Sequence, residues 1–524
     1  MEGYLCLVLH AHLPFVRHPE HDRFLEENWL FEAMTECYLP LLQLLEKWQE
    51  AGLAARVTIS LTPTLCAMLR DPLLQGRYQR HLEELIELAE KEALRTVWEP
   101  RLRPLAEFYL ERFVAARETY RGWGGDLVNA FRHYQDAGRI EIITSAATHA
   151  LLPLLANHPP SVRAQLGIAR EDYRRCFGRD PEGIWLPECA YYEGLEEVLR
   201  LAGLRWFITE THGLLHARPR PRYGPFAPVY TRAEVAAFAR DQACARQVWS
   251  RTEGYPGDAR YRDFYRDIGF DLDLDYLRPY LAAGGIRSFT GIKYHRITGG
   301  TGPKAIYERP AALAAVNEHA AHFLAARAEQ AWRLAGLLDR PPAIVAPYDA
   351  ELFGHWWFEG PEFLDALVRT ICVEKQTVRL ITPGDYLREH PTNQVATPAA
   401  SSWGEGGGWR VWLNEKNEWV FRQLAAAQLR MSDLVRRFPN PGPLQHRALQ
   451  QAGRELLLAQ ASDWPFILHT GTSADYARRR VVDHLRRFDR LERELTQDRV
   501  DEAALAAVEA QDNLFPELDY RLWE

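Results

Sequence analysis

The sequence predicts an α/β fold of the (β/α)-barrel type, and two observations support this prediction. Short apolar segments alternate along the chain with segments of helical periodicity, which is the pattern of βαβ units and a parallel sheet. Polar side chains follow several of the apolar segments at the point where each strand would end. The carboxyl ends of the strands form the active-site face of a (β/α) barrel, so we expect a site that includes the following residues: His10, His12, His149, Glu188 and Asp349.

The predicted strands are short apolar runs, each closed by a turn or a polar residue. They are expected at residues 4–9, 55–63, 140–144, 183–187, 205–210 and 343–346. Helices are expected at residues 30–48, which Gly52 follows, and at residues 193–202. This order places Glu188 directly after the fourth strand and Asp349 shortly after the sixth.

The length of 524 residues exceeds what one hydrophobic core supports, so we expect more than one domain. Residues 1–400 contain all the predicted strands and are expected to form the catalytic unit. They include a mostly helical insertion near residues 64–135 and a long loop region, rich in Pro, Gly and Tyr, near residues 213–266. Helical patterns run from about Trp419 to the end, so residues 401–524 are expected to form an α-helical C-terminal domain.

The composition excludes several classes of protein. The net charge is −8 and no dense basic patch occurs, so nucleic acid is not expected as a partner. No apolar run approaches the roughly 18 residues of a membrane span, and the N-terminus lacks the basic region and cleavage site of a signal peptide. The seven cysteines are scattered without a CxxC pair, which indicates reduced thiols and a cytoplasmic location.

Two acids lie in similar settings and form the leading catalytic hypothesis. Glu188 in "WLPECAYYEG" and Asp349 in "VAPYDAELFGHWWFEG" each come shortly after a proline and before an aromatic-containing turn. Cleavage of a glycosidic bond needs two carboxyl groups, one as nucleophile or base and one as acid. The alternative is that each acid is a helix N-cap or a surface residue. Because both acids share one setting at a strand end, we favour the catalytic interpretation.

The histidines allow more than one interpretation. His10 and His12 in "HAHLPF" point to one face of a strand end. They could bind a divalent metal with a nearby Asp or a third His, as in deacetylase-like barrels. They could instead bond sugar hydroxyls and the nucleophile, or be structural. His149, and Lys293 with His295 in "TGIKYHRITG", add polar groups that could keep Glu188 ionised while Asp349 stays protonated, or that could belong to an ordinary surface loop.

Three tryptophans lie in the Gly-rich segment "SSWGEGGGWRVWLN" that follows residue 400: Trp403, Trp409 and Trp412. A segment with this much glycine is a poor core element, whereas aromatic rings in a cleft are natural platforms for sugar rings. We therefore expect these three side chains to stack on a carbohydrate.

Several of these motifs occur in an order that resembles a known family. "HAHLPF", "TSAATHA", "GIWLPECAY", "APYDAELFGHWWFEG" and "SSWGEGG" resemble the motifs of glycoside hydrolase family 57, and within it those of the 1,4-α-glucan (glycogen) branching enzymes. "GYPGDARYRDFYRDIG", "QASDWPFILHTG" and "FPELDYRLW" extend the likeness over the whole chain. The resemblance implies an incomplete (β/α)7 TIM-like barrel with a helical insertion, and an α-helical C-terminal domain that closes over the cleft. It also implies a retaining mechanism without metal or organic cofactor.

The resemblance assigns roles to residues of this sequence. Glu188 matches the nucleophile and Asp349 the general acid/base, for which we expect carboxyl groups about 5–5.5 Å apart. Residues expected to bind the glucan, some from the motifs and some from their surroundings, are His10, His12, Trp29, His149, His295, Trp403, Trp412 and Asp463. The expected partner is an α-1,4-glucan, and the expected assembly state is a monomer or a weak homo-oligomer.

The reaction depends on what intercepts the glucosyl-enzyme. The C6 hydroxyl of another glucan gives a branching enzyme, whereas water or a C4 hydroxyl gives an α-amylase or a 4-α-glucanotransferase. Branching enzymes of the family have a mobile loop with a tyrosine, for which the candidates here are Tyr223, Tyr230 and Tyr255. We expect a lid in residues 213–257 and in the Trp403 segment. Two hypotheses from different classes are a metal-dependent polysaccharide deacetylase and a non-catalytic glucan-binding protein.

Overall fold

The computed structural model describes residues 3–250, 253–281, 285–299, 303–374 and 378–524. Within these residues the strands form two sheets, one of order β3-β2-β1-β8 with β9 also paired to β1, and one of order β4-β5-β7-β6. The strands of the first sheet are β1 (Gly3–Ala11), β2 (Val57–Leu61), β3 (Ile140–Ile143), β8 (Ala343–Asp349) and β9 (Val378–Leu380). Those of the second are β4 (Gly183–Trp185), β5 (Trp206–Thr209), β6 (Val229–Tyr230) and β7 (Ala236–Ala239).

The pairing is parallel throughout, except that β6 runs antiparallel to β7. Every residue of β1 and of β2 is buried, which explains why β1 reads as a nearly continuous apolar run. In β2 the polar residues Thr58 and Ser60 alternate with apolar ones and are buried as well. Single parallel bridges link the sheets at two places, between Thr144 and Ile184 and between Arg240 and Val345. The parallel strands of both sheets therefore end on the same side of the molecule.

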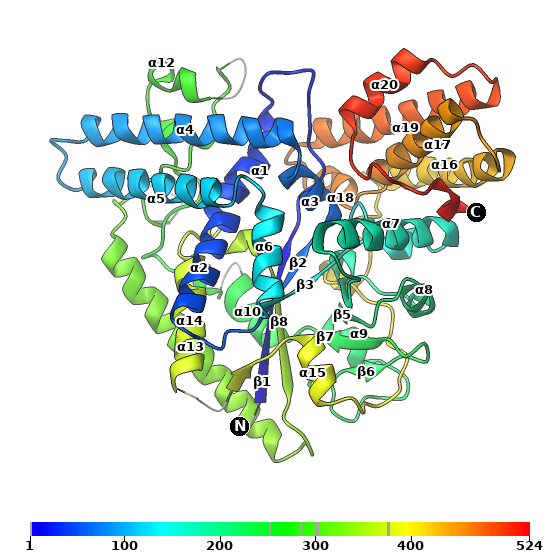
Figure 1. Ribbon diagram of the computed structural model, residues 1–524. Coiled ribbons are helices and arrows are strands. Elements are labelled where there is room, and N and C mark those ends of the chain that lie inside the picture. Colours follow the sequence, from blue (N-terminus) through cyan, green and yellow to red (C-terminus); the bar gives the residue numbers. More distant parts are fainter. Residues whose placement is uncertain (1–2, 251–252, 282–284, 300–302, 375–377) are drawn as a thin grey trace.

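Helices surround the sheets, as Figure 1 shows. After β1 the chain forms α1 (Asn28–Ala33), a π-helical turn (Met34–Tyr38) and α2 (Leu39–Glu50). Four helices then fill most of the region between β2 and β3: α3 (Pro63–Leu69), α4 (Pro72–Arg95), α5 (Arg103–Gly122) and α6 (Leu127–Asp136). The remaining helices before residue 400 are α7 (Pro159–Phe177), α8 (Leu195–Leu201), α9 (Thr211–Leu215), α10 (Gln242–Trp249), α11 (Ile268–Asp271), α12 (Leu274–Leu277), α13 (Arg309–Ala335), α14 (Gly360–Glu374) and α15 (Pro383–Glu389).

The long loop region predicted at residues 213–266 contains several short regular elements. The segment contains most of α9, the strands β6 and β7, the helix α10 and a 3-10 turn at Tyr255–Gly257. The prolines and glycines mark turns between short elements. The sequence predicts a lid here, and in the described part of the segment short helices and strands alternate with longer turns and loops.

The C-terminal region is helical and lies to one side of the sheets, next to α7 (Figure 1). Its helices are α16 (Glu418–Arg437), α17 (Pro443–Ala459), α18 (Asp463–Thr470), α19 (Ala474–Thr496) and α20 (Glu502–Gln511). The Arg-rich sequence of α19 buries one apolar stripe and leaves most of its arginines solvated, as helical periodicity predicts. The described residues contain no helix with the length and hydropathy of a membrane span.

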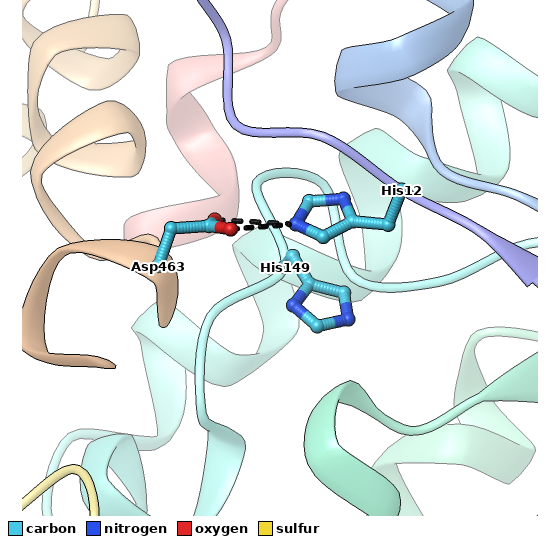
Figure 2. A group of neighbouring side chains, drawn as sticks. All are labelled: His12, His149 and Asp463. Carbon is cyan, nitrogen blue, oxygen red and sulfur yellow. Dashed lines mark hydrogen bonds and ion pairs between the residues drawn. The ribbon is translucent and has the colours of Figure 1, made fainter. Parts of the chain in front are cut away.

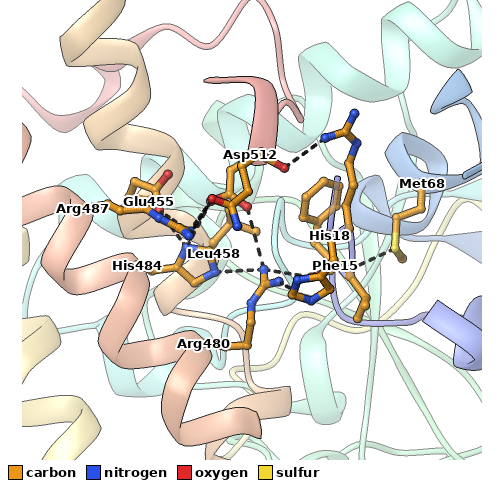
Figure 3. Close-up of polar contacts among 12 residues, drawn as sticks. Phe15, His18, Met68, Glu455, Leu458, Arg480, His484, Arg487 and Asp512 are labelled. Carbon is orange, nitrogen blue, oxygen red and sulfur yellow. Dashed lines mark hydrogen bonds and ion pairs between the residues drawn. The ribbon is translucent and has the colours of Figure 1, made fainter. Parts of the chain in front are cut away.

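A buried polar network ties this helical region to the loop that follows β1 (Figure 3). His484 Nδ1 lies 2.7 Å from a carboxylate oxygen of Glu455, and Arg487 donates to Asp512 over 2.7 Å. Arg480 lies next to this group and donates to the carbonyl of Phe15 over 3.1 Å. Because Phe15 is three residues past His12, the network helps to fix the loop that leaves the carboxyl end of β1.

Candidate active site

Three polar side chains form one row at the carboxyl edge of the first sheet. His10 of β1 is in register with Ser60 of β2 on one side and with Asp349 of β8 on the other. His10 Nδ1 lies 3.1 Å from Ser60 Oγ, and both residues are buried. The sequence predicts that His10 and Asp349 lie at or beyond their strand ends. The strands are longer than predicted, so His10 lies inside β1 and Asp349 is the last residue of β8.

Glu188 lies just beyond β4 in an unusual backbone conformation. After β4 the chain forms a 3-10 turn at Pro187–Cys189, in which Glu188 has φ 63° and Cys189 has φ 50°. Residues other than glycine rarely adopt this left-handed conformation, and such strain is concentrated at functional sites. The Trp403 backbone N–H donates to the Glu188 carbonyl over 3.1 Å. The turn is therefore held by the segment that follows residue 400.

The Glu188 carboxylate accepts one hydrogen bond at each oxygen. Trp403 Nε1 donates to Oε2 over 2.7 Å, and Ser462 Oγ donates to Oε1 over 2.8 Å. The side chain is 13% exposed. Burial raises the pKa of Glu188 to about 6, and the bonds from Trp403 and Ser462 oppose this rise. The carboxylate is therefore ionised at neutral pH and held in one orientation.

Asp349 lies in a different electrostatic environment. Burial and the neighbouring Glu351 and Glu188 carboxyl groups raise the pKa of Asp349 well above its ordinary range. Glu351 itself is fixed, because the backbone N–H of His12 and the hydroxyl of Tyr38 both donate to its Oε1, over 3.1 and 2.5 Å. One carboxyl group thus ionises near pH 6 while the other keeps its proton, which is the division that acid-assisted attack by a carboxylate requires.

The histidines form a stack next to Glu188. The rings of His12 and His149 are 3.8 Å apart between centroids, and those of His10 and His149 are 5.0 Å apart. His12 Nε2 lies 3.1 and 3.2 Å from the two carboxylate oxygens of Asp463, as Figure 2 shows. Burial opposes a charge on His12, but the ion pair with Asp463 outweighs burial and raises the pKa of His12. The Asp463 carboxylate therefore favours the positive form of an imidazole that lies beside the nucleophile candidate.

Two of these histidines and Asp463 are also the candidates for a metal site. His12, His149 and Asp463 each place a potential ligand atom within 4.8 Å of the others. Each of these atoms already has a protein partner, since His12 bonds Asp463 and His149 Nδ1 lies 2.9 Å from Ser462 Oγ. The arrangement therefore favours the hydrogen-bonding interpretation over the metal interpretation.

Of the three tryptophans in the Gly-rich segment that follows residue 400, Trp403 contacts Glu188, whereas Trp409 and Trp412 pack in an apolar cluster. Trp403 is half-buried, and its ring lies edge-on to Trp185 at 5.2 Å. Trp412 is only 1% exposed and packs in a small apolar cluster with Leu151. In this conformation the Trp412 ring supports its neighbours and presents no free face for stacking, so a glucan contact at Trp412 stays a prediction. Trp409 is half-buried at the edge of the same cluster.

Other predicted residues lie apart from Glu188. The ring of Trp29, on α1, is half-buried and lies edge-on to Tyr476 of α19 at 5.8 Å. His295 pairs through its backbone with Ile306, and none of its contacts within the described residues reaches Glu188.

Each candidate tyrosine has a defined place in the structure, and Tyr223 lies in the turns that precede β6. Tyr255 is buried and bonds His322 over 2.7 Å, Tyr230 belongs to β6, and the hydroxyl of Tyr223 donates to Asp339 over 2.5 Å.

Comparison with known proteins identifies the family. The family model described as glycosyl hydrolase family 57 matches residues 6–398, which is most of the chain. The chain belongs to glycosyl hydrolase family 57. A second model, described as the C-terminal part of 1,4-alpha-glucan branching enzyme, matches residues 423–523.

Relatives of this family 57 chain include proteins named as branching enzymes and one named as an alpha-amylase. It is 33% identical to a 1,4-alpha-glucan branching enzyme of Thermococcus kodakarensis, over 98% of this chain and 78% of the relative. A branching enzyme structure from Pyrococcus horikoshii superposes with a TM-score of 0.89 at 33% identity, covering 100% of this chain and 97% of the other. The structure of the alpha-amylase AmyC from Thermotoga maritima superposes with a TM-score of 0.94 at 43% identity, covering 100% and 99%.

Two residues of this family 57 site are not among those predicted from the sequence. Ser462 bonds Glu188 although the two are 274 residues apart in the chain. Its position directly before Asp463, in the motif "QASDWPF", is the one signal that pointed to it. Glu351 lies two residues past Asp349, and the polar pattern of "DAELF" could have identified it.

Proposed function

We propose that this protein is a 1,4-α-glucan branching enzyme. It cleaves an α-1,4 glucosidic bond and transfers the released chain to a C6 hydroxyl, which forms an α-1,6 branch. The observation that supports this best is the pair formed by an ionisable Glu188 and a protonated Asp349, in a chain whose C-terminal region matches that of branching enzymes. The substrate is then an α-1,4-glucan, and neither nucleic acid nor a membrane takes part.

In the proposed mechanism Glu188 attacks the anomeric carbon while Asp349 protonates the leaving oxygen. A covalent glucosyl-enzyme forms, and Asp349, now ionised, removes the proton from the attacking C6 hydroxyl. This double displacement retains the configuration and needs carboxyl groups about 5–5.5 Å apart. No metal or organic cofactor has a role in these steps.

The surrounding side chains hold the glucan and the nucleophile. Trp403 and Ser462 orient the Glu188 carboxylate, and the charged pair of His12 and Asp463 lies beside it, where it can bond sugar hydroxyls. Further glucan contacts are proposed for His10, Trp29, His149, His295 and Trp412, the last of these only if its segment moves. Transfer in place of hydrolysis requires that an acceptor hydroxyl be held near the intermediate while water is excluded.

We further propose that the two sheets are arcs of one incomplete (β/α)7 barrel. The bridges between Thr144 and Ile184 and between Arg240 and Val345 support this, because they continue parallel pairing from β3 to β4 and from β7 to β8. The ring would then be β1-β2-β3-β4-β5-β7-β8. Residues 1–400 would form the catalytic unit and residues 401–524 the helical domain over its cleft, in a cytoplasmic monomer or weak homo-oligomer.

The test measures both products of one reaction. Purified protein is incubated with amylose, and α-1,6 linkages, counted after enzymatic debranching, are compared with new reducing ends. Branching predicts more α-1,6 linkages than new reducing ends, with Glu188→Gln and Asp349→Asn inactive. A majority of reducing ends would instead assign hydrolysis, as the name of AmyC suggests for that relative. Loss of activity with a chelator would support the metal interpretation of His12.

A further inference from the structure

We propose that Ser462 is a positioning residue for the reaction. It is the last donor in a hydrogen-bond relay in which every bond is donated toward Glu188. The relay runs from Ser60 through His10 and His149 to Ser462 and ends on Oε1 of Glu188. The proposal rests on the proposed function for the role of Glu188 as nucleophile, but the direction of the relay can be tested without any activity.

The contacts of the relay are continuous. Ser60 Oγ lies 3.1 Å from His10 Nδ1, and His10 Nε2 lies 3.0 Å from His149 Nε2. His149 Nδ1 lies 2.9 Å from Ser462 Oγ, which lies 2.8 Å from Glu188 Oε1. The first four residues are each at most 3% exposed, so water does not compete for these bonds.

Only one direction of the relay fits an ionised Glu188. A carboxylate only accepts hydrogen bonds, so Ser462 must donate its single hydroxyl proton to Oε1. Ser462 Oγ then accepts, which requires a proton on His149 Nδ1. A neutral imidazole has one N–H, so His149 Nε2 is bare and accepts from His10 Nε2–H. His10 Nδ1 is bare in turn and accepts from Ser60.

Both imidazoles are neutral, as this direction requires. Burial and the positive charge on His12 lower the pKa of His10 well below its usual value. Burial, and after it the neighbouring His12, do the same for the pKa of His149. Reversal of the relay would put a proton on Glu188 Oε1. The direction of the chain and the ionised state of the nucleophile are therefore linked, and aligned bonds strengthen one another.

The backbone builds the relay from distant parts of the chain. The Ser462 N–H donates to the His149 carbonyl over 3.0 Å, and Ala150 pairs with Ala461. His149 has φ 55°, a left-handed conformation like that of Glu188, and this turns its ring toward the site. The short pairing between these segments places Ser462, at the start of α18, between an imidazole and the carboxylate.

Other charged groups also act on Glu188 and must be held constant in the test. His12 favours its ionised form, whereas the carboxylate of Asp463 disfavours it. Trp403 bonds the opposite oxygen. A variant at either serine of the relay leaves all of these groups in place.

The experiment compares pH profiles of kcat/KM for Ser462→Ala, Ser462→Thr and Ser60→Ala with the unmodified protein. The free energy of a hydrogen bond to an ionised group corresponds to a factor of about ten or more in rate. We therefore expect Ser462→Ala to lower kcat/KM by about that factor. The acidic limb should move up by about one pH unit. Ser462→Thr keeps the hydroxyl, so its acidic limb should lie at the pH of the unmodified protein. Ser60→Ala should move the acidic limb in the same direction as Ser462→Ala, but by less.

Ser161→Ala is the matched control. Ser161 is also buried and lies 3.0 Å from the Nδ1 of a histidine, His158, but no carboxylate ends that pair. This variant should leave the acidic limb unchanged. The relay is overturned if Ser462→Ala lowers the rate without moving the limb, or if Ser161→Ala moves it as much as Ser60→Ala does.

A second measurement tests the direction itself and covers the case in which Ser462→Ala does not fold. Neutron diffraction from perdeuterated crystals of the full chain at neutral pH should show deuterium on His10 Nε2 and on His149 Nδ1. Deuterium on His149 Nε2 or on Glu188 Oε1 would overturn the relay. If Glu188→Gln remained active, the proposed function would fail while this result would still stand, so the two failures can be told apart.

Discussion

Replacing Trp403 with phenylalanine tests how much one hydrogen bond contributes to the reactivity of Glu188. The change removes the Nε1–H that donates to Oε2 over 2.7 Å. It keeps an aromatic ring against Trp185 and near the guanidinium of Arg240, 5.6 Å from the Trp403 ring. A hydrogen bond to a charged group is worth about 1.5–3 kcal/mol. At about 1.4 kcal/mol per factor of ten, kcat/KM should fall roughly 10- to 100-fold.

The same bond opposes the rise in the pKa of Glu188, so its removal should raise that pKa from about 6. The expected shift of the acidic limb is about one to two pH units. Initial rates on a soluble maltooligosaccharide, measured across pH 4 to 9, give both quantities. Trp409→Phe is the control, because Trp409 lies in the same segment and has no bond to Glu188 within the described residues. A change of less than threefold with an unmoved limb would refute the reasoning.

Three further outcomes are expected. The unmodified protein should show a bell-shaped pH profile of kcat/KM, falling below about pH 6 as Glu188 is protonated and on the alkaline side only when Asp349 loses its proton; a monotonic profile would contradict the paired roles. Gly354→Ala should lower the free energy of unfolding in urea by about 1–3 kcal/mol or more. The new Cβ would lie 1.8 Å from the Glu36 carbonyl oxygen, and Gly354 has φ +117°, which residues with a side chain rarely adopt. Gly76→Ala in α4 is the control and should be neutral or stabilising. Arg480→Met should lower the free energy of unfolding by about 1–3 kcal/mol, because the Phe15 carbonyl loses its buried donor while Arg487 still pairs with Asp512. The solvated Arg486→Met should change that free energy by less than about 0.5 kcal/mol.

The strand ends were predictable from the sequence because they obey a local rule. A buried parallel strand reads as an apolar run, and the polar residue that closes it lies at the carboxyl edge. This rule located Glu188 and Asp349, and the structure places Asp349 in register with His10. The exact strand ends were less predictable, because the polar His10 is accepted inside β1 by its bond to Ser60.

The remaining features depend on contacts that no local pattern reports. Trp412 looked like a loop residue because of its glycine neighbours, yet one of those glycines allows close packing, since a Cβ on Gly404 would lie 2.5 Å from the Trp412 ring. Ser462 carries no signal of its own, because serine is common and its importance comes from a partner 274 residues away. Composition likewise gave no sign of the short helices and strands within residues 213–266, because turns and loops separate them.

The bond between Ser462 and Glu188 also has a consequence for how the protein is made. Protein synthesis proceeds from the N-terminus, and domains generally fold in that order. The strands of both described sheets are complete by residue 380, long before Ser462 has left the ribosome. Until then Glu188 lacks the donor to its Oε1, and the loop after β1 lacks the Arg480 contact. A nascent chain therefore carries Glu188, the proposed nucleophile, in an incomplete site, and the site is complete only when translation is nearly finished.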